Sequence, residues 1–267
     1  MRNHPSTKEI LKRIVELERH LNGLKVIPAT HRLRSLVVLP LLSKALTLGR
    51  AICALIDAGF PAEAFATSRT LLEILFSVRY ITNKLTEQRA EKYIKYQARV
   101  KMEWMKIAQK HFPEKAANLT ALDTATLEIA KEFASKGNWT GVRGQIKMMA
   151  IEEDDHEFDE RGKGFRNEFD YDGLYFWTSQ YVHATVAGID GHVSKRGEVF
   201  KVRIRKHLEK DCAADALFIT AVSLCKVFVY ACRSMNEAQP NAIQELYKMI
   251  RKFYRNSGRK ISRSAAV

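Results

Sequence analysis

The chain has 267 residues, of which 46% are hydrophobic and 28% charged, so it is long and apolar enough to bury a full core. This composition excludes a disordered chain, a collagen and a disulfide-stapled scaffold. Lys and Arg outnumber Asp and Glu by 44 to 30, which leaves a formal net charge of +14. Such an excess favours anionic partners, namely RNA, DNA or the headgroups of an anionic membrane surface.

Cysteine usage and the amino terminus indicate a reducing, intracellular setting. The four cysteines, Cys53, Cys212, Cys225 and Cys232, contain no Cys-x-x-Cys pair, so we expect buried, reduced thiols and no cofactor. The amino terminus lacks the apolar core of a signal peptide. The longest apolar run, residues 216–225, is about half of what a membrane span needs. The sequence therefore predicts a cytoplasmic protein with no transmembrane segment.

The first element is predicted to be an amphipathic helix within residues 1–24. Ser6 and Glu9 have the spacing of a capping box, and Gly23 ends the pattern. The apolar positions recur at steps of four and three: Ile10, Ile14, Leu17 and Leu21. We expect this helix to be a dimerisation arm that pairs with a second copy, which makes the protein a homodimer.

Helices continue through the first half of the chain. An apolar segment over residues 33–58, interrupted by Pro40, is followed by a second one over residues 61–83, and the two predict an antiparallel hairpin. Further helices are expected from Thr86 to about residue 109, from Pro113 to Gly137, and over residues 141–150.

The second half of the chain opens with a change of composition. Residues 152–172 alternate in charge and predict a solvated loop. The expected elements after it are a helix over 172–187, a loop or short hairpin over 188–206, a long buried helix over 208–235 and a last helix from Pro240.

The fold class is therefore all-α, as a single bundle of about eight or nine helices with room for one short β-hairpin. We divide the chain into the arm at 1–24, a helical core at 25–239 and a basic carboxy-terminal helix and tail at 240–267.

Arg69 and Glu73 are the first candidate site residues, because they lie one helical turn apart in a strongly apolar segment. Buried charges must be paired. One interpretation is a salt bridge that fixes helix register; the other makes Arg69 an anchor for an anion or phosphate, oriented by Glu73.

A second set, Tyr175, Ser179 and His183, has four-residue steps and so lies on nearly one helix face. Ser179 and His183 could satisfy each other or Glu73 within the core. Alternatively, His183 is a general acid or base, Ser179 or Tyr175 donates a hydroxyl, and Arg69 stabilises a developing negative charge.

Three segments resemble the pattern of a bacterial family of unknown function, DUF5677. They are Arg69-Thr-Leu-Leu-Glu73, residues 139–150 and the segment from Tyr175 to His183, and the similarity spans roughly residues 33–235. The resemblance implies an all-helical fold in which the Arg-x-x-x-Glu helix and the Ser-x-x-x-His helix come together. It implies no established activity.

A looser resemblance is to the HEPN superfamily, helical proteins that often act as ribonucleases in toxin and antiphage systems and usually carry an Arg followed shortly by a His. No Arg stands at that spacing before His183, so Arg69 would have to complete the site from across the bundle. Arg13 and His20 do have such a spacing on the first helix, but one chance match is unsurprising in so basic a chain.

The carboxy-terminal segment is the strongest basic stretch. Its bases follow Glu245 without a further acid, and Tyr247, Phe253 and Tyr254 are interleaved: Lys248, Arg251, Lys252, Arg255, Arg259 and Lys260. Such a segment could neutralise phosphates while its rings stack on unpaired bases. The alternative is a solvated helix whose aromatic residues dock on the bundle.

Metal and nucleotide motifs are weak. His156 lies among acidic residues without the spacing of a calcium loop or of paired Glu-x-x-His helices, so we expect a charged loop and no metal. No glycine-rich phosphate loop, nucleophile elbow or His-Glu-x-x-His occurs, which argues against a P-loop NTPase, an α/β-hydrolase and a zincin.

These observations favour a protein that binds nucleic acid, RNA in particular, with metal-independent endoribonuclease activity in a defence or toxin-like system as its candidate chemistry. The alternative is a non-enzymatic scaffold or regulatory subunit that acts through helix-mediated protein contacts. Deep burial of Arg69, Glu73 and His183 without a pocket favours the scaffold, whereas their convergence in an open basic groove favours the enzyme.

Overall fold

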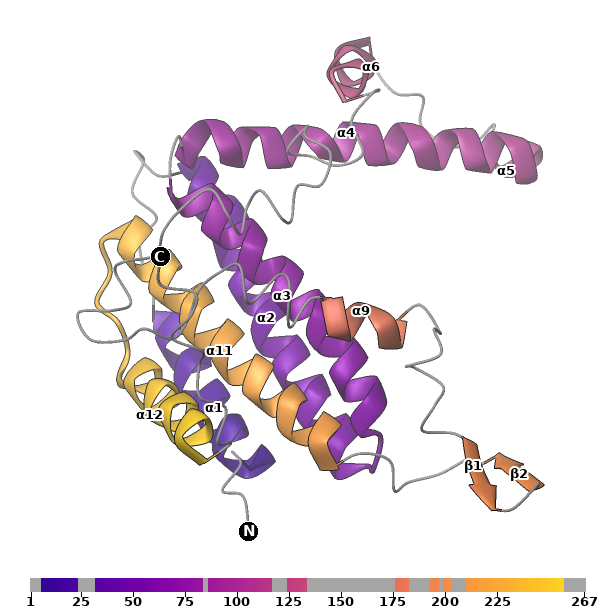
Figure 1. The fold of residues 1–267 in the computed structure, drawn as a ribbon. Helices are drawn as coiled ribbons and strands as arrows, with labels where there is room; N and C mark the ends of the chain where they lie inside the picture. Colours follow the sequence, from indigo (N-terminus) through magenta and orange to yellow (C-terminus); the bar gives the residue numbers. More distant parts are fainter. Residues whose placement is uncertain are drawn as a thin grey trace, which may run out of the picture.

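The fold is all-α, as the sequence predicts. A computed structural model of the chain describes residues 6–23, 32–83, 86–116, 124–133, 176–182, 193–196, 199–202 and 210–256. Within them, the strands β1 (Val193–Arg196) and β2 (Val199–Val202) pair antiparallel, and the other regular elements are helices (Figure 1). The total number of helices depends on segments outside the described residues, among them the expected helix over 141–150.

Three helices, α2 (Arg32–Asp57), α3 (Pro61–Asn83) and α11 (Lys210–Met235), lie side by side at the centre of the bundle (Figure 1). Every residue from 216 to 229 of α11 is buried. A helix that is apolar on all sides must be surrounded by other elements. Helices α2 and α3, together with helices described below, supply these surroundings for α11.

The α2–α3 hairpin begins and ends where the sequence indicates, with one difference. Gly59 closes α2 in the left-handed conformation (φ 85°), and Phe60 N–H donates to the Leu55 carbonyl at 2.7 Å. Pro40, however, does not interrupt α2, which continues through it. Pro40 is exposed while Val38 and Leu42 beside it are buried, so packing on both sides of the proline overrides its local tendency to break the helix.

Helix α1 (Thr7–Gly23) begins at the predicted capping box. Glu9 N–H donates to Ser6 Oγ at 3.2 Å, and Ser6 N–H donates to Glu9 Oε2 at 2.8 Å. The apolar stripe that follows is buried inside its own chain, with Ile10, Ile14 and Leu17 all fully inaccessible. The expectation that this stripe is displayed for a second copy is therefore wrong, and a homodimer would need another surface.

A glycine lets α1 approach the centre of the bundle. A Cβ atom at Gly49 of α2 would lie 3.0 Å from Ile14 Cδ1 and 3.4 Å from Leu224 Cδ1. Helices α1, α2 and α11 thus meet at this point, and a larger side chain would push α1 outward.

Helix α12 (Asn241–Asn256) also packs on the bundle, against α11 and α1. Its residues Ile243, Leu246 and Ile250 are buried in the same core as those of α1. Helices α1 and α12 therefore share one core with α2, α3 and α11, and residues 7–23 are not a separate arm. The expected helix at the carboxy terminus is present as α12, and the expected tail beyond residue 256 lies outside the described residues.

Helix α4 (Thr86–His111) starts against α2 and α3 and then extends away from the bundle, followed by α5 (Pro113–Ala116) (Figure 1). Helix α6 (Thr124–Lys131) packs on α4, where the Tyr96 and Phe133 rings meet edge to face at 5.4 Å. The helix expected from Pro113 to Gly137 is thus not one helix, because α5 ends at Ala116.

Two helices are long and apolar enough to cross a membrane by length and composition, Leu33–Asp57 and Cys212–Met235. The apolar window of the second is 89% buried within the structure and that of the first 44%. A core helix of a bundle passes the same test, and α11 has the burial of a core helix. The absence of a transmembrane segment stays a prediction.

We predict that Leu17→Ala lowers the free energy of unfolding by about 2–5 kcal/mol, because it leaves a cavity under α1. Leu36→Ala is the matched control: Leu36 is 50% exposed, and its truncation should cost about 0.5 kcal/mol or less. Urea unfolding followed by circular dichroism measures both values. Equal stabilities, together with loss of a dimer in the Leu17 variant, would show that α1 acts as an arm after all.

Candidate functional site

Arg69 and Glu73 form the intrahelical ion pair that their spacing predicts. Arg69 Nη2 lies 3.4 Å from Glu73 Oε1 on α3, and the two side chains are 19% and 40% exposed. The pair therefore lies at the edge of the core and is partly solvated. Leu71 and Leu72, between the two charges, are fully buried, whereas Thr70 is exposed. The apolar character of the segment therefore suggests a deeper burial of the two charges than the structure has.

Helix α9 (Phe176–Val182) packs against α3 near this pair. The Tyr181 ring meets the Phe65 ring edge to face, with centroids 5.0 Å apart, and Phe65 lies one helical turn before Arg69. The Cys212 thiol donates to the Tyr181 hydroxyl at 3.5 Å, which joins α9 to the start of α11. The two helices named by the family resemblance therefore do come together.

The candidate residues of the second set are only partly described. Ser179 lies on α9 and is half-buried, and its neighbour Thr178 is fully buried. Tyr175 and His183 fall outside the described residues. The structure therefore brings the helices of Arg69, Glu73 and Ser179 together, and the shared cluster with His183 stays a prediction.

The basic segment at the carboxy terminus presents its bases on one face of a docked helix. Lys248, Arg251 and Lys252 of α12 are exposed, on the side away from the buried aliphatic residues. The Arg251 guanidinium lies 5.7 Å from the centroid of the Tyr247 ring, and that ring packs against the core. Arg255 lies on the last turn of α12, whereas Arg259 and Lys260 fall outside the described residues.

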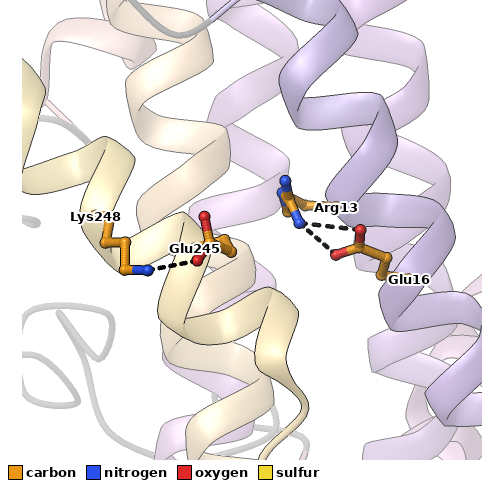
Figure 2. Close-up of polar contacts among 4 residues, drawn as sticks. All are labelled: Arg13, Glu16, Glu245 and Lys248. Atoms are coloured by element: carbon orange, nitrogen blue, oxygen red, sulfur yellow. Dashed lines mark hydrogen bonds and ion pairs between the residues drawn. The ribbon is translucent and has the colours of Figure 1, made fainter.

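Bases of α1 adjoin this face. Figure 2 shows the Arg13–Glu16 pair of α1 beside the Glu245–Lys248 pair of α12, the latter with Nζ 2.6 Å from Oε1. The pKa of the Glu245 carboxyl is lowered, chiefly by its hydrogen bond with Lys248 and further by Arg13 and Lys12 of α1. Helices α1 and α12 together thus form one charged surface.

The same surface holds the acid of the capping box. The pKa of the Glu9 carboxyl is lowered, chiefly by the hydrogen bonds from the Ser6 backbone and hydroxyl, and Lys252 of α12 adds to this effect. We call the exposed bases Lys12, Lys248, Arg251 and Lys252 the α1–α12 face.

Arg13 and His20 both lie on α1, and Arg13 is paired with an acid of the same helix. Arg13 Nη1 donates to both carboxylate oxygens of Glu16, at 2.9 and 2.7 Å. The Nε2 atom of His20 is buried. The guanidinium is thus committed to a neighbouring acid on its own helix.

The cysteines are buried and reduced, as predicted. Burial raises the pKa of the Cys53 and Cys225 thiols to about 12 and that of Cys232 to about 11. A thiolate nucleophile is therefore disfavoured at these three positions. Among the residues that the structure describes, no three His, Cys, Asp or Glu side chains gather as a metal site; His156 and the acidic residues around it lie outside them.

Comparison with known proteins places the chain in a family. Residues 35–200 match the model of DUF5677, a family of unknown function, and this match covers more than half of the chain. The chain belongs to this family. No match was found among curated proteins or among solved structures.

The DUF5677 match includes α3 and α9 and so the ion pair and Ser179, but it ends before α11 and α12. It is shorter at its carboxy-terminal end than the similarity over 33–235 that the motifs indicate. The α1–α12 face lies outside the matched region. Membership of the family therefore gives no information on the role of that face.

The structure buries other cations more deeply than Arg69. Arg79 of α3 is 3% exposed, Lys226 of α11 2% and Arg34 of α2 6%. Each lies in a helix that is rich in apolar residues, as Arg69 does. An apolar sequence around a base does not show how deeply that base is buried. The sequence therefore singles out Arg69, although three other bases are buried more deeply.

Arg34 belongs to a contact that holds the start of α2. The Leu33 amide donates to Glu87 Oε2 of α4 at 3.1 Å. Burial lowers the pKa of Arg34, and the nearby Glu87 carboxylate opposes this effect. The carboxylate thus serves both a free amide at a helix start and a buried cation.

We predict that Glu73→Gln lowers the free energy of unfolding by less than about 1 kcal/mol, because the ion pair is partly solvated. Phe65→Ala, which removes the ring that contacts α9, should cost about 3–5 kcal/mol. Chemical unfolding measures both. A cost of Glu73→Gln as large as that of Phe65→Ala would mean that the pair is a structural element of the core.

Proposed function

We propose that the protein binds nucleic acid, RNA in particular, through the α1–α12 face. The observation that carries the proposal is the separation of the two sides of α12. Its aliphatic residues are buried in the core, which fixes the helix, and Lys248, Arg251 and Lys252 are exposed on its other side. Bases held on a fixed element can contact several phosphates at once.

Binding of this kind should be largely independent of sequence. Tyr247 packs against the core beneath Arg251 and is not free to stack on a base. The contacts left to the described part of the face are charges, which recognise phosphates and carry no base information. Glu245 is paired with Lys248, and Glu9 is hydrogen-bonded by Ser6 with Lys252 nearby; both pKa values are lowered. These contacts limit the repulsion between the two carboxylates and a phosphate backbone.

The proposal extends to chemistry at the α3–α9 contact. There, His183 acts as a general acid or base, Ser179 or Tyr175 supplies a hydroxyl, and Arg69 stabilises negative charge on a phosphate, without a metal. Support comes from the packing of α9 against the half of α3 that carries Arg69. The resemblance to HEPN ribonucleases suggests a defence or toxin-like role in the cytoplasm.

The second candidate function is a scaffold or regulatory subunit. It is favoured by the Arg69–Glu73 pair, which gives each charge a partner on its own helix without any ligand. We retain a homodimer as part of either proposal, with an interface other than the buried stripe of α1. Light scattering at micromolar concentration tests the dimer, and a monomer at all concentrations would exclude it.

Replacing Arg251, Lys252 and Arg255 with Gln should weaken RNA binding to a similar extent for different sequences. Three lost contacts should reduce the slope of log affinity against log salt by up to about 2, at about 0.7 per single-strand phosphate contact. Fluorescence anisotropy with labelled RNAs at several salt concentrations measures the slope.

The matched control for this experiment replaces Lys44, Lys95 and Lys131 with Gln, since these surface bases lie on α2, α4 and α6 and change the net charge equally. Equal weakening in both triple variants would mean that net charge alone causes binding. Unchanged affinity and slope in the α12 variant would reject the face and favour the scaffold.

For the chemistry, we expect purified protein to cleave total RNA with and without a chelator, and His183→Ala to abolish cleavage. The His183 variant should retain RNA affinity, because the α1–α12 face is intact in it. The separate measurement of binding and cleavage distinguishes anchoring from catalysis. Cleavage that survives in His183→Ala, or that stops with chelator, would exclude the proposed mechanism.

A further inference from the structure

The distal half of α4 carries an exposed apolar stripe. Val100, Trp104 and Ile107 are 45%, 57% and 49% exposed. Their spacing of four and three residues places them on one face of the helix. We call these three residues the α4 stripe. They lie on the part of α4 that extends away from the bundle (Figure 1), so the bundle does not cover them.

Positive charges accompany the α4 stripe on both sides. Between residues 99 and 110 the helix has four bases and one acid: Arg99, Lys101, Lys106, Lys110 and Glu103. Glu103 is already paired, with Arg99 Nη1 at 2.7 Å and Lys106 Nζ at 3.1 Å. At about 100° per residue, Lys101 lies on one flank of the stripe and Arg99, Lys106 and Lys110 lie on the other.

We propose that the distal half of α4 binds the surface of an anionic lipid bilayer as a peripheral, interfacial helix. Such helices insert an apolar face that contains Trp and aliphatic side chains just below the headgroups, while flanking Lys and Arg reach the anionic headgroups. The α4 stripe supplies the apolar face, and the bases on its two flanks lie where the headgroups would be. Phe112, directly after α4 and 52% exposed, adds apolar surface at its end.

The charge of this segment argues against a second copy as the occupant. Two distal α4 helices would bring eight bases and two acids together, twice the number in one segment, and like charges on paired helices repel. The apolar repeat is also too short for a coiled coil, which needs about three to four heptads. An occupant with negative charge is therefore favoured over this chain itself.

The aliphatic residues argue for lipid over nucleic acid at this place. Trp104 alone could stack on a base, but Val100 and Ile107 offer neither stacking nor hydrogen bonds. Both side chains gain from transfer into an acyl boundary. The stripe also lies away from α1 and α12 (Figure 1), so this proposal does not rest on the proposed nucleic-acid function.

The test uses the full-length protein and two kinds of vesicle, one of phosphatidylcholine alone and one of equimolar phosphatidylcholine and phosphatidylglycerol. We expect co-sedimentation with the anionic vesicles only, and weaker binding at high salt. The double variant Trp104→Ser with Ile107→Ser should bind them at least about tenfold more weakly. Lys101→Gln with Lys110→Gln should also weaken binding, without affecting the stripe.

Ile94→Ser is the matched control, because Ile94 is 42% exposed on the same helix but lies off the stripe. It should bind anionic vesicles as the parent does. Circular dichroism of each variant establishes that loss of binding is not loss of fold, and a fluorescence blue shift with vesicles that disappears in Trp104→Phe places that residue in the bilayer.

Several outcomes would overturn the proposal. These are no binding to either vesicle, equal binding to both, or an unchanged affinity in the Trp104 and Ile107 double variant. If that variant instead loses RNA affinity or a dimer in light scattering, the stripe contacts nucleic acid or a second copy and the lipid proposal is wrong.

Discussion

The structure depends on the burial of α11. Its residues from 216 to 229 are buried on every side, and each fully buried aliphatic side chain contributes about 1.5–3 kcal/mol. No two helices can cover such a surface, so α2 and α3 need further helices beside them. Helices α1 and α12 meet this need, and the lack of a side chain at Gly49 of α2 leaves room there for Ile14 of α1 and Leu224 of α11. Because the apolar sides of α1 and α12 face the core, their charged sides face the solvent.

The candidate site is a consequence of how α3 is shared. One side of α3 packs on α11 and α2, and α9 packs on the half that begins near Phe65. Arg69 and Glu73 lie at the edge of the packed surface, where they remain partly solvated and pair with each other. A buried pair would be costly to separate, whereas a partly solvated pair can exchange its partner for a ligand at a small cost. This property is consistent with the phosphate contact that we propose for Arg69.

Local signals in the sequence predict the ends of elements well and their partners poorly. Ser6 with Glu9, Gly59, Pro61 and Thr86 mark helix boundaries through short-range contacts, and the Arg69–Glu73 pair also depends only on helical spacing. The stripe of α1 indicates a buried face, but an amphipathic pattern is the same whether the cover is a second copy or the chain's own core. Packing also decides against the local signal at Pro40, and it buries Lys226 more completely than Arg69.

Net charge alone does not separate the partners of a basic protein, but the side chains that accompany the charge do. On α12 the aliphatic residues are buried in the core, and no large hydrophobic residue among the side chains described up to Lys252 is exposed beside bases such as Lys248 and Arg251. A surface of that kind attracts any polyanion in proportion to its phosphate density. On the distal half of α4 the bases flank Trp104 and two aliphatic residues that are half exposed. A partner for this surface needs negative charge for the bases and an apolar interior for the three apolar side chains. We therefore propose different classes of partner for two surfaces of the same sign, and a substitution in one should leave binding at the other unaffected.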